Sequence, residues 1–114
     1  MCLGRNELYA TVTEKQFHQQ IVQAAHLCGW MLYHTYDSRR SEAGYPDDTL
    51  VHPVSGDFFL IEEKTEKGRL SPAQKRWIAA LEASHIEVHV YRPHQIDEII
   101  ARLQRTKHDC ALTA

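Results

Sequence analysis

The sequence predicts an α/β fold in which helices flank a small mixed β-sheet, in the order α-β-β-β-α-β-α. Three observations lead to this prediction. Apolar residues recur at helical spacing in three segments, four short segments are rich in β-forming residues, and turn residues separate these segments. The chain has 114 residues and a mass of 13.2 kDa, which suits a single domain. We expect its core to cover about residues 13–103, with loose ends.

The first predicted helix covers residues 13–28. Thr13 and Gln16 have the spacing of a capping box, and Gly29 is a typical residue for the end of a helix. The apolar residues at helical spacing are Phe17, Ile21, Ala24 and Cys28. The segment 1–12 lacks such a pattern and is expected to be a loose entry to the domain.

Four segments predict the strands of the sheet. Residues 30–36 are aromatic and apolar, residues 47–54 look extended, residues 58–65 form the next apolar run, and residues 86–91 alternate. A turn signal at residues 54–57 separates the second strand from the third.

Two further helices follow the third and fourth strands. Ser71 is a suitable N-cap and Pro72 is tolerated at the first helical position. The apolar stripe of this helix is Trp77, Ile78 and Leu81. Pro93 ends the fourth strand, and the last helix is marked by Ile96, Ile99, Ile100 and Leu103.

Composition and charge limit the classes of function. Hydrophobic residues make up 43% and charged residues 25% of the chain, as in ordinary globular domains. No apolar run approaches the roughly 20 residues of a membrane helix. The formal net charge is −2 and the pI is near 6.4. Nucleic acid binding would therefore need a local basic patch or metal ions.

The remaining residue counts favour a reducing compartment. The three cysteines, at positions 2, 28 and 110, fit neither a disulfide scaffold nor a zinc site of paired cysteines. The first residues do not resemble a secretory signal, and we expect a cytoplasmic protein of a bacterial or phage-infected cell. No glycine-rich phosphate loop is present, so we expect no nucleotide cofactor. Because no apolar run is long enough for a membrane helix, we also expect no membrane partner.

Acidic and basic residues converge on the predicted hairpin. If the turn at 54–57 closes an even-numbered loop, antiparallel pairing places Asp47 opposite Lys64 and Thr49 opposite Glu62. Because side chains alternate along a strand, Asp47, Glu62 and Lys64 then share one face of the sheet. An odd-numbered loop would place Asp47 on the other face.

This grouping suits hydrolysis of a phosphodiester. Two neighbouring carboxylates repel unless a positive group lies between them, and oxygen ligands favour Mg²⁺ or Mn²⁺. A bound ion could polarise a phosphoryl oxygen, while Lys64 could orient the attacking water or stabilise developing charge. The alternative is a salt-bridge cluster on the surface of the strand pair, and these three residues alone do not decide between the two interpretations.

Glu14 and Gln74 are further candidates for the same site. Glu14 lies on or beside the inward stripe of the first helix and could be a third carboxylate, or it could simply complement the helix dipole. Gln74 shares a face with the apolar stripe of its helix and could contact the site or the scissile phosphate. Alternatively, it is the capping-box partner of Ser71.

A set of basic residues is expected beside the proposed site, on two loops and at the start of a helix. Arginine and lysine side chains there are candidates for contacts with the phosphates of a nucleic acid, and the alternative is an ordinary solvated surface. These residues are Arg39, Arg40, Lys67, Arg69, Lys75 and Arg76. His34 is expected near the first of these loops, whereas nothing in the sequence marks His18 as a ligand.

Three motifs in order resemble the PD-(D/E)XK nuclease superfamily and, within it, the VRR-NUC family. The motifs are Gly44-Tyr45-Pro46-Asp47, Glu62-Glu63-Lys64 and Gly68-Arg69-Leu70-Ser71-Pro72-Ala73-Gln74. The likeness covers about residues 13–103. It also includes Gly29-Trp30, His34-Thr35, Asp37-Ser38-Arg39-Arg40-Ser41 and Tyr91-Arg92-Pro93.

The resemblance implies a restriction-endonuclease-like core and a metal-dependent endonuclease that hydrolyses DNA with Mg²⁺ or Mn²⁺. It implies roles for Asp47 and Glu62 as metal ligands, Lys64 as catalytic lysine, the Glu63 backbone carbonyl as a further ligand, Glu14 as the helical acidic residue and Gln74 as the motif glutamine. Stand-alone members resemble Holliday-junction resolvases and tend to be homodimers, which implies branched or structured DNA in replication or repair. Two alternatives stay open: a DNA-binding module that does not cut, and a small dimeric structural protein.

Two positions depart from the family pattern. Asp48 and Glu63 stand where apolar residues are expected. Under the register above they face each other on the side of the sheet opposite Asp47 and Glu62. We therefore expect that they could form a second acidic pair on that side, or that Glu63 pairs with a nearby cation.

Overall fold

A computed structural model describes residues 5–35 and 41–105. The elements, in order, are α1 (Arg5–Ala10), α2 (Glu14–Leu27), β1 (Met31–His34), β2 (Asp48–Val51), β3 (Phe58–Glu63), α3 (Pro72–Ala83), β4 (Val88–Tyr91), the 3₁₀ helix η1 (Pro93–Gln95) and α4 (Ile96–Gln104). From α2 onward the predicted order of helices and strands is confirmed. The expectation of a loose entry segment is wrong for residues 5–10, which form α1 beside η1.

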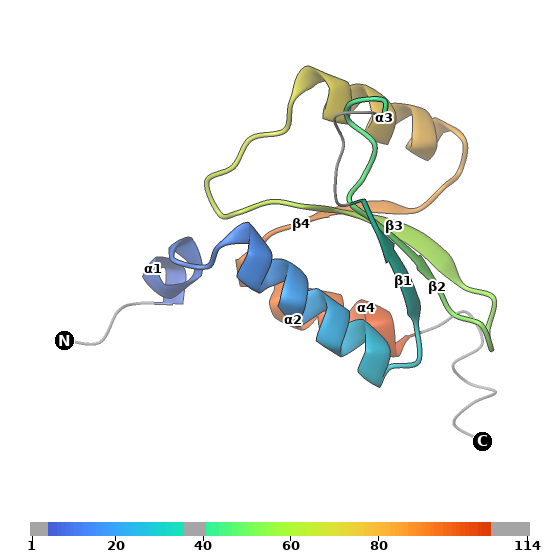
Figure 1. Cartoon of the computed structure of the whole chain (residues 1–114), viewed down its shortest axis with the longest axis horizontal. Coiled ribbons are helices and arrows are strands. Elements are labelled where there is room, and N and C mark those ends of the chain that lie inside the picture. The colour runs from blue at the N-terminus through green and yellow to red at the C-terminus, as the bar shows by residue number, and fades with distance from the viewer. Residues whose placement is uncertain (1–4, 36–40, 106–114) are drawn as a thin grey trace.

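The four strands form one mixed sheet in the order β1-β2-β3-β4. The pairs β1–β2 and β2–β3 are antiparallel, while β3 and β4 are parallel and are connected through α3. Figure 1 shows α3 on one side of the sheet and α2 with α4 on the other. None of the helices in the described ranges is long and apolar enough to cross a membrane.

The main core lies between the sheet and the layer of α2 and α4. Its members come from both helices, from β2, β3 and β4, and from the segment before β1. They are Phe17, Ile21, Ala25, Trp30, Leu50, Phe59, Ile61, Tyr91, Ile99 and Leu103. On the α3 side, Leu60 is buried but α3 itself contributes no buried residue. The α3 face is therefore the more open side of the sheet.

Both predicted capping boxes are present. The Thr13 hydroxyl accepts from the Gln16 N–H at 3.1 Å, and the Gln16 side chain accepts from the Thr13 N–H at 3.0 Å. Gly29 follows α2 with a φ of +83°, a conformation that favours glycine. These local signals place the start and end of α2 within a residue or two of the prediction.

The predicted hairpin register is wrong by two residues. Asp48 pairs with Ile61 and Thr49 with Leu60, because a six-residue loop, 52–57, connects β2 to β3. A shift of two residues keeps every side chain on its expected face. The observed register therefore changes the cross-strand partners of Asp47 and Glu63, but each side chain stays on the predicted face of the sheet.

Candidate metal and catalytic site

Asp47 is positioned by the turn that precedes β2. Gly44 has a φ of +100°, and a Cβ there would lie 2.5 Å from the carbonyl carbon of Ala73, so only glycine fits against the start of α3. The Tyr45 ring meets the edge of Trp77 with centroids 5.2 Å apart, and the following proline is buried. The Gly-Tyr-Pro-Asp motif thus packs against α3 and places Asp47 beside the end of β3.

Asp47 and Glu62 come together at one end of the sheet. Continuing the β2–β3 register places Asp47 directly opposite Glu62, and Asp47 Oδ2 accepts a 2.8 Å hydrogen bond from the Glu63 N–H. Burial, together with the nearby Asp47 carboxylate, raises the pKa of Glu62 to about 8. Burial also raises the pKa of Asp47. Ionising both acids is therefore unfavourable without a positive charge between them.

Gln74 combines both of its predicted roles. Its Oε1 accepts from the Ser71 N–H at 2.8 Å, which completes the capping box of α3. Its Nε2 donates to Glu62 Oε1 at 2.8 Å. The other oxygen, Glu62 Oε2, is buried without a hydrogen-bond partner in the structure.

Lys64 lies just beyond β3, on the same face as Glu62. Its N–H donates to the Tyr91 carbonyl at 3.0 Å, and its charge lowers the pKa of Glu62 against the effect of burial. The side chain is half-buried. The structure thus brings Asp47, Glu62 and Lys64 to one place, as predicted.

The loop after Lys64 is held by Arg92, whose role the sequence did not suggest. Arg92 Nη1 donates to the carbonyls of Thr65 and Gly68, each at 2.6 Å, and to that of Glu66 at 3.3 Å. This guanidinium fixes the path of the chain between β3 and α3.

Four of the six predicted basic residues lie on this loop and on α3. They are Lys67, Arg69, Lys75 and Arg76, and all are exposed. Arg39 and Arg40 lie outside the described residues. Lys75 and Arg76 directly follow Gln74 in the first turns of α3.

Glu14 reaches the same region from α2. It is the first residue of that helix and lines a cavity of about 440 Å³ together with Asp47 and Glu63. Its charge raises the pKa of Asp47 as one of the smaller contributions after burial. Glu14 therefore belongs to the acidic region, as one of the two interpretations expected.

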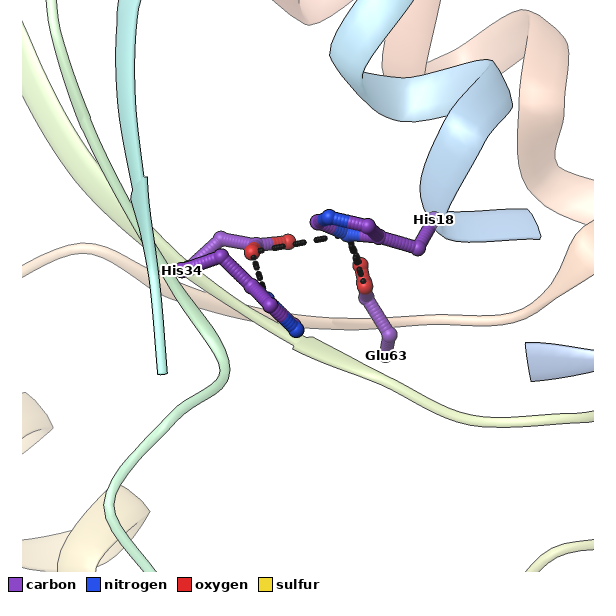
Figure 2. Close-up of side chains that lie close together, drawn as sticks. His18, His34 and Glu63 are labelled. Atoms are coloured by element: carbon purple, nitrogen blue, oxygen red, sulfur yellow. Dashed lines mark hydrogen bonds and ion pairs between the residues drawn. The ribbon is translucent and has the colours of Figure 1, made fainter. Parts of the chain in front are cut away.

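Behind this site lies a second cluster, which we call the histidine cluster: His18, His34, Asp48 and Glu63. His18 Nδ1 lies 2.6 Å from Glu63 Oε1 and 3.7 Å from Asp48 Oδ1, and His34 Nδ1 lies 2.7 Å from the same Asp48 oxygen. Figure 2 shows His18 of α2 pointing toward Glu63 and His34 on the strands. The second acidic pair is thus present on the α2 side, although the carboxylates are diagonal rather than opposite.

The sequence analysis missed the two histidines of this cluster. His18 lies four residues after Glu14 on the same side of the helix, and His34 pairs with Asp48 across the β1–β2 ladder. Burial lowers the pKa of His18 and raises that of Glu63 to about 10. The available signal was the coincidence of acids at normally apolar positions with histidines on facing elements.

Comparisons with known proteins agree with this geometry. Over 56 residues, the chain is 41% identical to the Fanconi-associated nuclease 1 homolog of Schizosaccharomyces pombe, a match that covers 49% of this chain and 8% of that protein. The chain thus spans a small part of the relative's length. A solved structure described as a VRR_NUC domain matches with a TM-score of 0.65 at 22% identity, covering 77% of this chain and 94% of that one, which shows a shared fold.

The family model is the more extensive match. The VRR-NUC domain model matches residues 4–95, most of the chain. The two motifs that carry Asp47 and Glu62–Lys64 lie within this range. The chain therefore belongs to the VRR-NUC domain family.

Proposed function

We propose that this protein is a metal-dependent nuclease that hydrolyses phosphodiester bonds in DNA. The observation that carries the proposal is the convergence of Asp47, Glu62 and Lys64 at the end of the β2–β3 pair, with Gln74 bonded to Glu62. The family match and the name of the Schizosaccharomyces pombe relative support a role in DNA repair.

The donor set fits a hard divalent cation. Glu62 Oε2 is buried without a partner, and burial raises the pKa of both Glu62 and Asp47, so a cation between them would relieve an unfavourable arrangement. Asp47 and Glu62 would hold Mg²⁺ or Mn²⁺, with the Glu63 backbone carbonyl and Glu14 as further candidates. When bound, such an ion polarises phosphoryl oxygens and makes water more acidic.

Other residues of the protein would position the water, the metal ligand and the DNA. Lys64 supplies a positive donor that orients the attacking water or stabilises charge developing on the phosphate. Gln74 fixes one oxygen of Glu62, which leaves the other oxygen free to face a ligand. Arg92 holds the loop that carries Lys67 and Arg69, two cations that we assign to DNA phosphates.

We extend the proposal to branched DNA and to a homodimer. A chain of 114 residues offers little surface for two DNA arms, whereas two copies would offer a symmetric pair of sites. The edge strand β1 exposes Met31 and Tyr33, 63% and 70% respectively, which gives an apolar surface for such pairing. Light scattering of the purified chain tests the dimer independently of cleavage.

A cleavage assay tests the activity. The full chain is incubated with Mg²⁺ or Mn²⁺ and supercoiled, flap or four-way DNA, beside a Lys64→Ala variant and a Glu82→Ala control on the exposed side of α3. We expect cutting that depends on the cation, is lost in Lys64→Ala and is unchanged in the control. Binding without cutting by the unaltered chain would instead assign it to non-catalytic DNA binding.

A further inference from the structure

We propose that the histidine cluster is a second metal site, for a divalent transition cation, with Zn²⁺ as the ion it suits best. The site would be distinct from the one formed by Asp47 and Glu62, although Asp47 lines the same cavity as His18, His34 and Glu63. It lies on the opposite face of the sheet, beneath α2, where Asp48 and Glu63 replace the apolar residues expected of the family.

Four elements meet at this cluster. His18 comes from α2, His34 from β1, Asp48 from β2 and Glu63 from β3. One ligand atom from each lies within 4.8 Å of all the others. A tetrahedral zinc site with bonds of about 2.0–2.1 Å sets its ligand atoms about 3.4 Å apart, so only small side-chain rotations would close the four groups on an ion.

The histidines pair with only part of the buried carboxylate surface here. Asp48 is fully buried, and its Oδ2 has no hydrogen-bond partner in the structure. The neighbouring Glu63 is 3% exposed. Two buried carboxylates this close need either a shared proton or a cation.

The donor chemistry distinguishes this site from the first. Two imidazoles with two carboxylates are a ligand set for zinc and similar ions, whereas Mg²⁺ prefers oxygen ligands alone.

The position of the cluster suggests what its ion would do. Asp48 follows Asp47, Glu63 follows Glu62, and His18 lies one helical turn after Glu14. An ion held by the cluster would tie α2 to three strands and so fix the acids of the first site. We therefore assign the ion a positioning role and not a part in hydrolysis.

Metal analysis of the untagged full chain tests the proposal. Chelator-treated protein is titrated with Zn²⁺ in the presence of excess Mg²⁺, and binding is followed by calorimetry and by the visible absorption of Co²⁺ as a substitute ion. The cluster is removed by His18→Gln with His34→Gln. The matched control is His26→Gln with His85→Gln, two exposed histidines outside the cluster.

The result expected is about one Zn²⁺ per chain, as for a closed structural site, in the unaltered protein and in the control. The cluster variant should bind Zn²⁺ at least about tenfold more weakly, since even indirect support of a ligand is worth 10–100-fold in affinity. An Asp48→Asn with Glu63→Gln variant, which needs no cation to fold, should show the same loss. Equal Zn²⁺ binding in all variants, or none in the unaltered chain, would overturn the proposal whatever the cleavage assay shows.

Discussion

The acidic residues at the two ends of the sheet differ in whether the protein supplies hydrogen-bond partners for all of their oxygens. Where β3 and β4 begin, Arg102 of α4 satisfies the acids: its Nε donates to Glu87 at 2.6 Å and its Nη2 donates to Asp57 at 3.2 Å. Its guanidinium also lies 4.3 Å from the centre of the Phe59 ring. Where β3 ends, the Asp47–Glu62 site and the histidine cluster hold four buried or half-buried acids, and two of their oxygens lack any partner.

This difference distinguishes acids that stabilise the fold from acids that we assign to a ligand site. The buried Asp57 and the exposed Glu87 both accept hydrogen bonds from Arg102, so this group is paired without any further cation. At the other end, burial and neighbouring carboxylates raise the pKa values of Asp47, Glu62 and Glu63, so these acids are complete only with a proton or a cation. Substitutions at either end of the sheet test this comparison.

The largest effect on stability is expected from Arg102→Leu. This change leaves the buried Asp57 without its ion-pair partner, and removing one member of a buried pair costs about 3–5 kcal/mol. Urea unfolding of the variant measures the loss, with Arg105→Leu, an exposed neighbour, as the control. A loss of less than about 1 kcal/mol would mean that this end is not held by the pair.

The largest effect on activity is expected from Glu62→Gln. The variant keeps the size of the side chain but loses a cation ligand, and cleavage should fall at least about 10²-fold, as for other preorganised electrostatic groups. Its stability without metal should equal or exceed that of the unaltered chain, because a strained acid is gone. Initial cleavage rates beside those of Glu82→Gln measure the effect, and a rate near that of the control would contradict the account.

The pH dependence of stability tests whether the acids at the end of β3 are unbalanced. The pKa values of Glu62 and Glu63 are raised to about 8 and about 10, so folding favours their protonated forms. Their contribution is therefore full below the unfolded pKa values and is lost as pH rises from there through the folded values of about 8 and about 10. Chelator-treated protein should melt about 5 °C lower or more at pH 9 than at pH 6, where 1 kcal/mol corresponds to about 4–8 °C. A melting temperature that is flat or rises over this range would argue against unbalanced acids.

Gln74 gives the smallest effect and separates its two roles. Gln74→Ala removes both the cap and the bond to Glu62, and should cost about 1 kcal/mol of stability and about tenfold in cleavage, as for other residues that orient a metal ligand. Gln74→Glu keeps an oxygen for the cap but cannot donate to ionised Glu62. If Gln74→Glu cleaves as well as the unaltered chain, the bond to Glu62 has no part in the reaction.

Local signals predicted much of this fold. Both capping boxes and the glycine after α2 were visible as short-range patterns. The side of the sheet on which Asp47, Glu62 and Lys64 lie was also predicted correctly, because alternation along a strand survives an error of two residues. The membership of the site therefore followed from the sequence even though the pairing did not.

The pairing register of β2 and β3 depends on the His52 side chain, which is not part of any known turn pattern. His52 Nδ1 accepts from the N–H groups of Val54 and Ser55 at 3.3 and 3.2 Å, inside a loop closed by a 2.8 Å bond from the His52 N–H to the Asp57 carbonyl. The length of this loop could therefore not be predicted from the sequence, because a histidine is not a typical turn residue.

The histidine cluster was hidden for a different reason. His18, His34 and Glu63 lie far apart along the chain and meet only when α2 packs on the sheet. Each residue alone has an ordinary interpretation as a solvated or hydrogen-bonded group. Long-range packing, and not local pattern, creates the cluster.

The central claim is that Asp47 and Glu62 require a divalent cation to complete their end of the sheet. The most direct measurement is the melting temperature of chelator-treated full chain as Mn²⁺ is added, beside the Asp47→Asn with Glu62→Gln variant. A ligand of the native state must stabilise it, so the melting temperature of the unaltered chain should rise with Mn²⁺ while that of the variant rises far less. An equal response of the two proteins, or no response in the unaltered chain, would contradict the account.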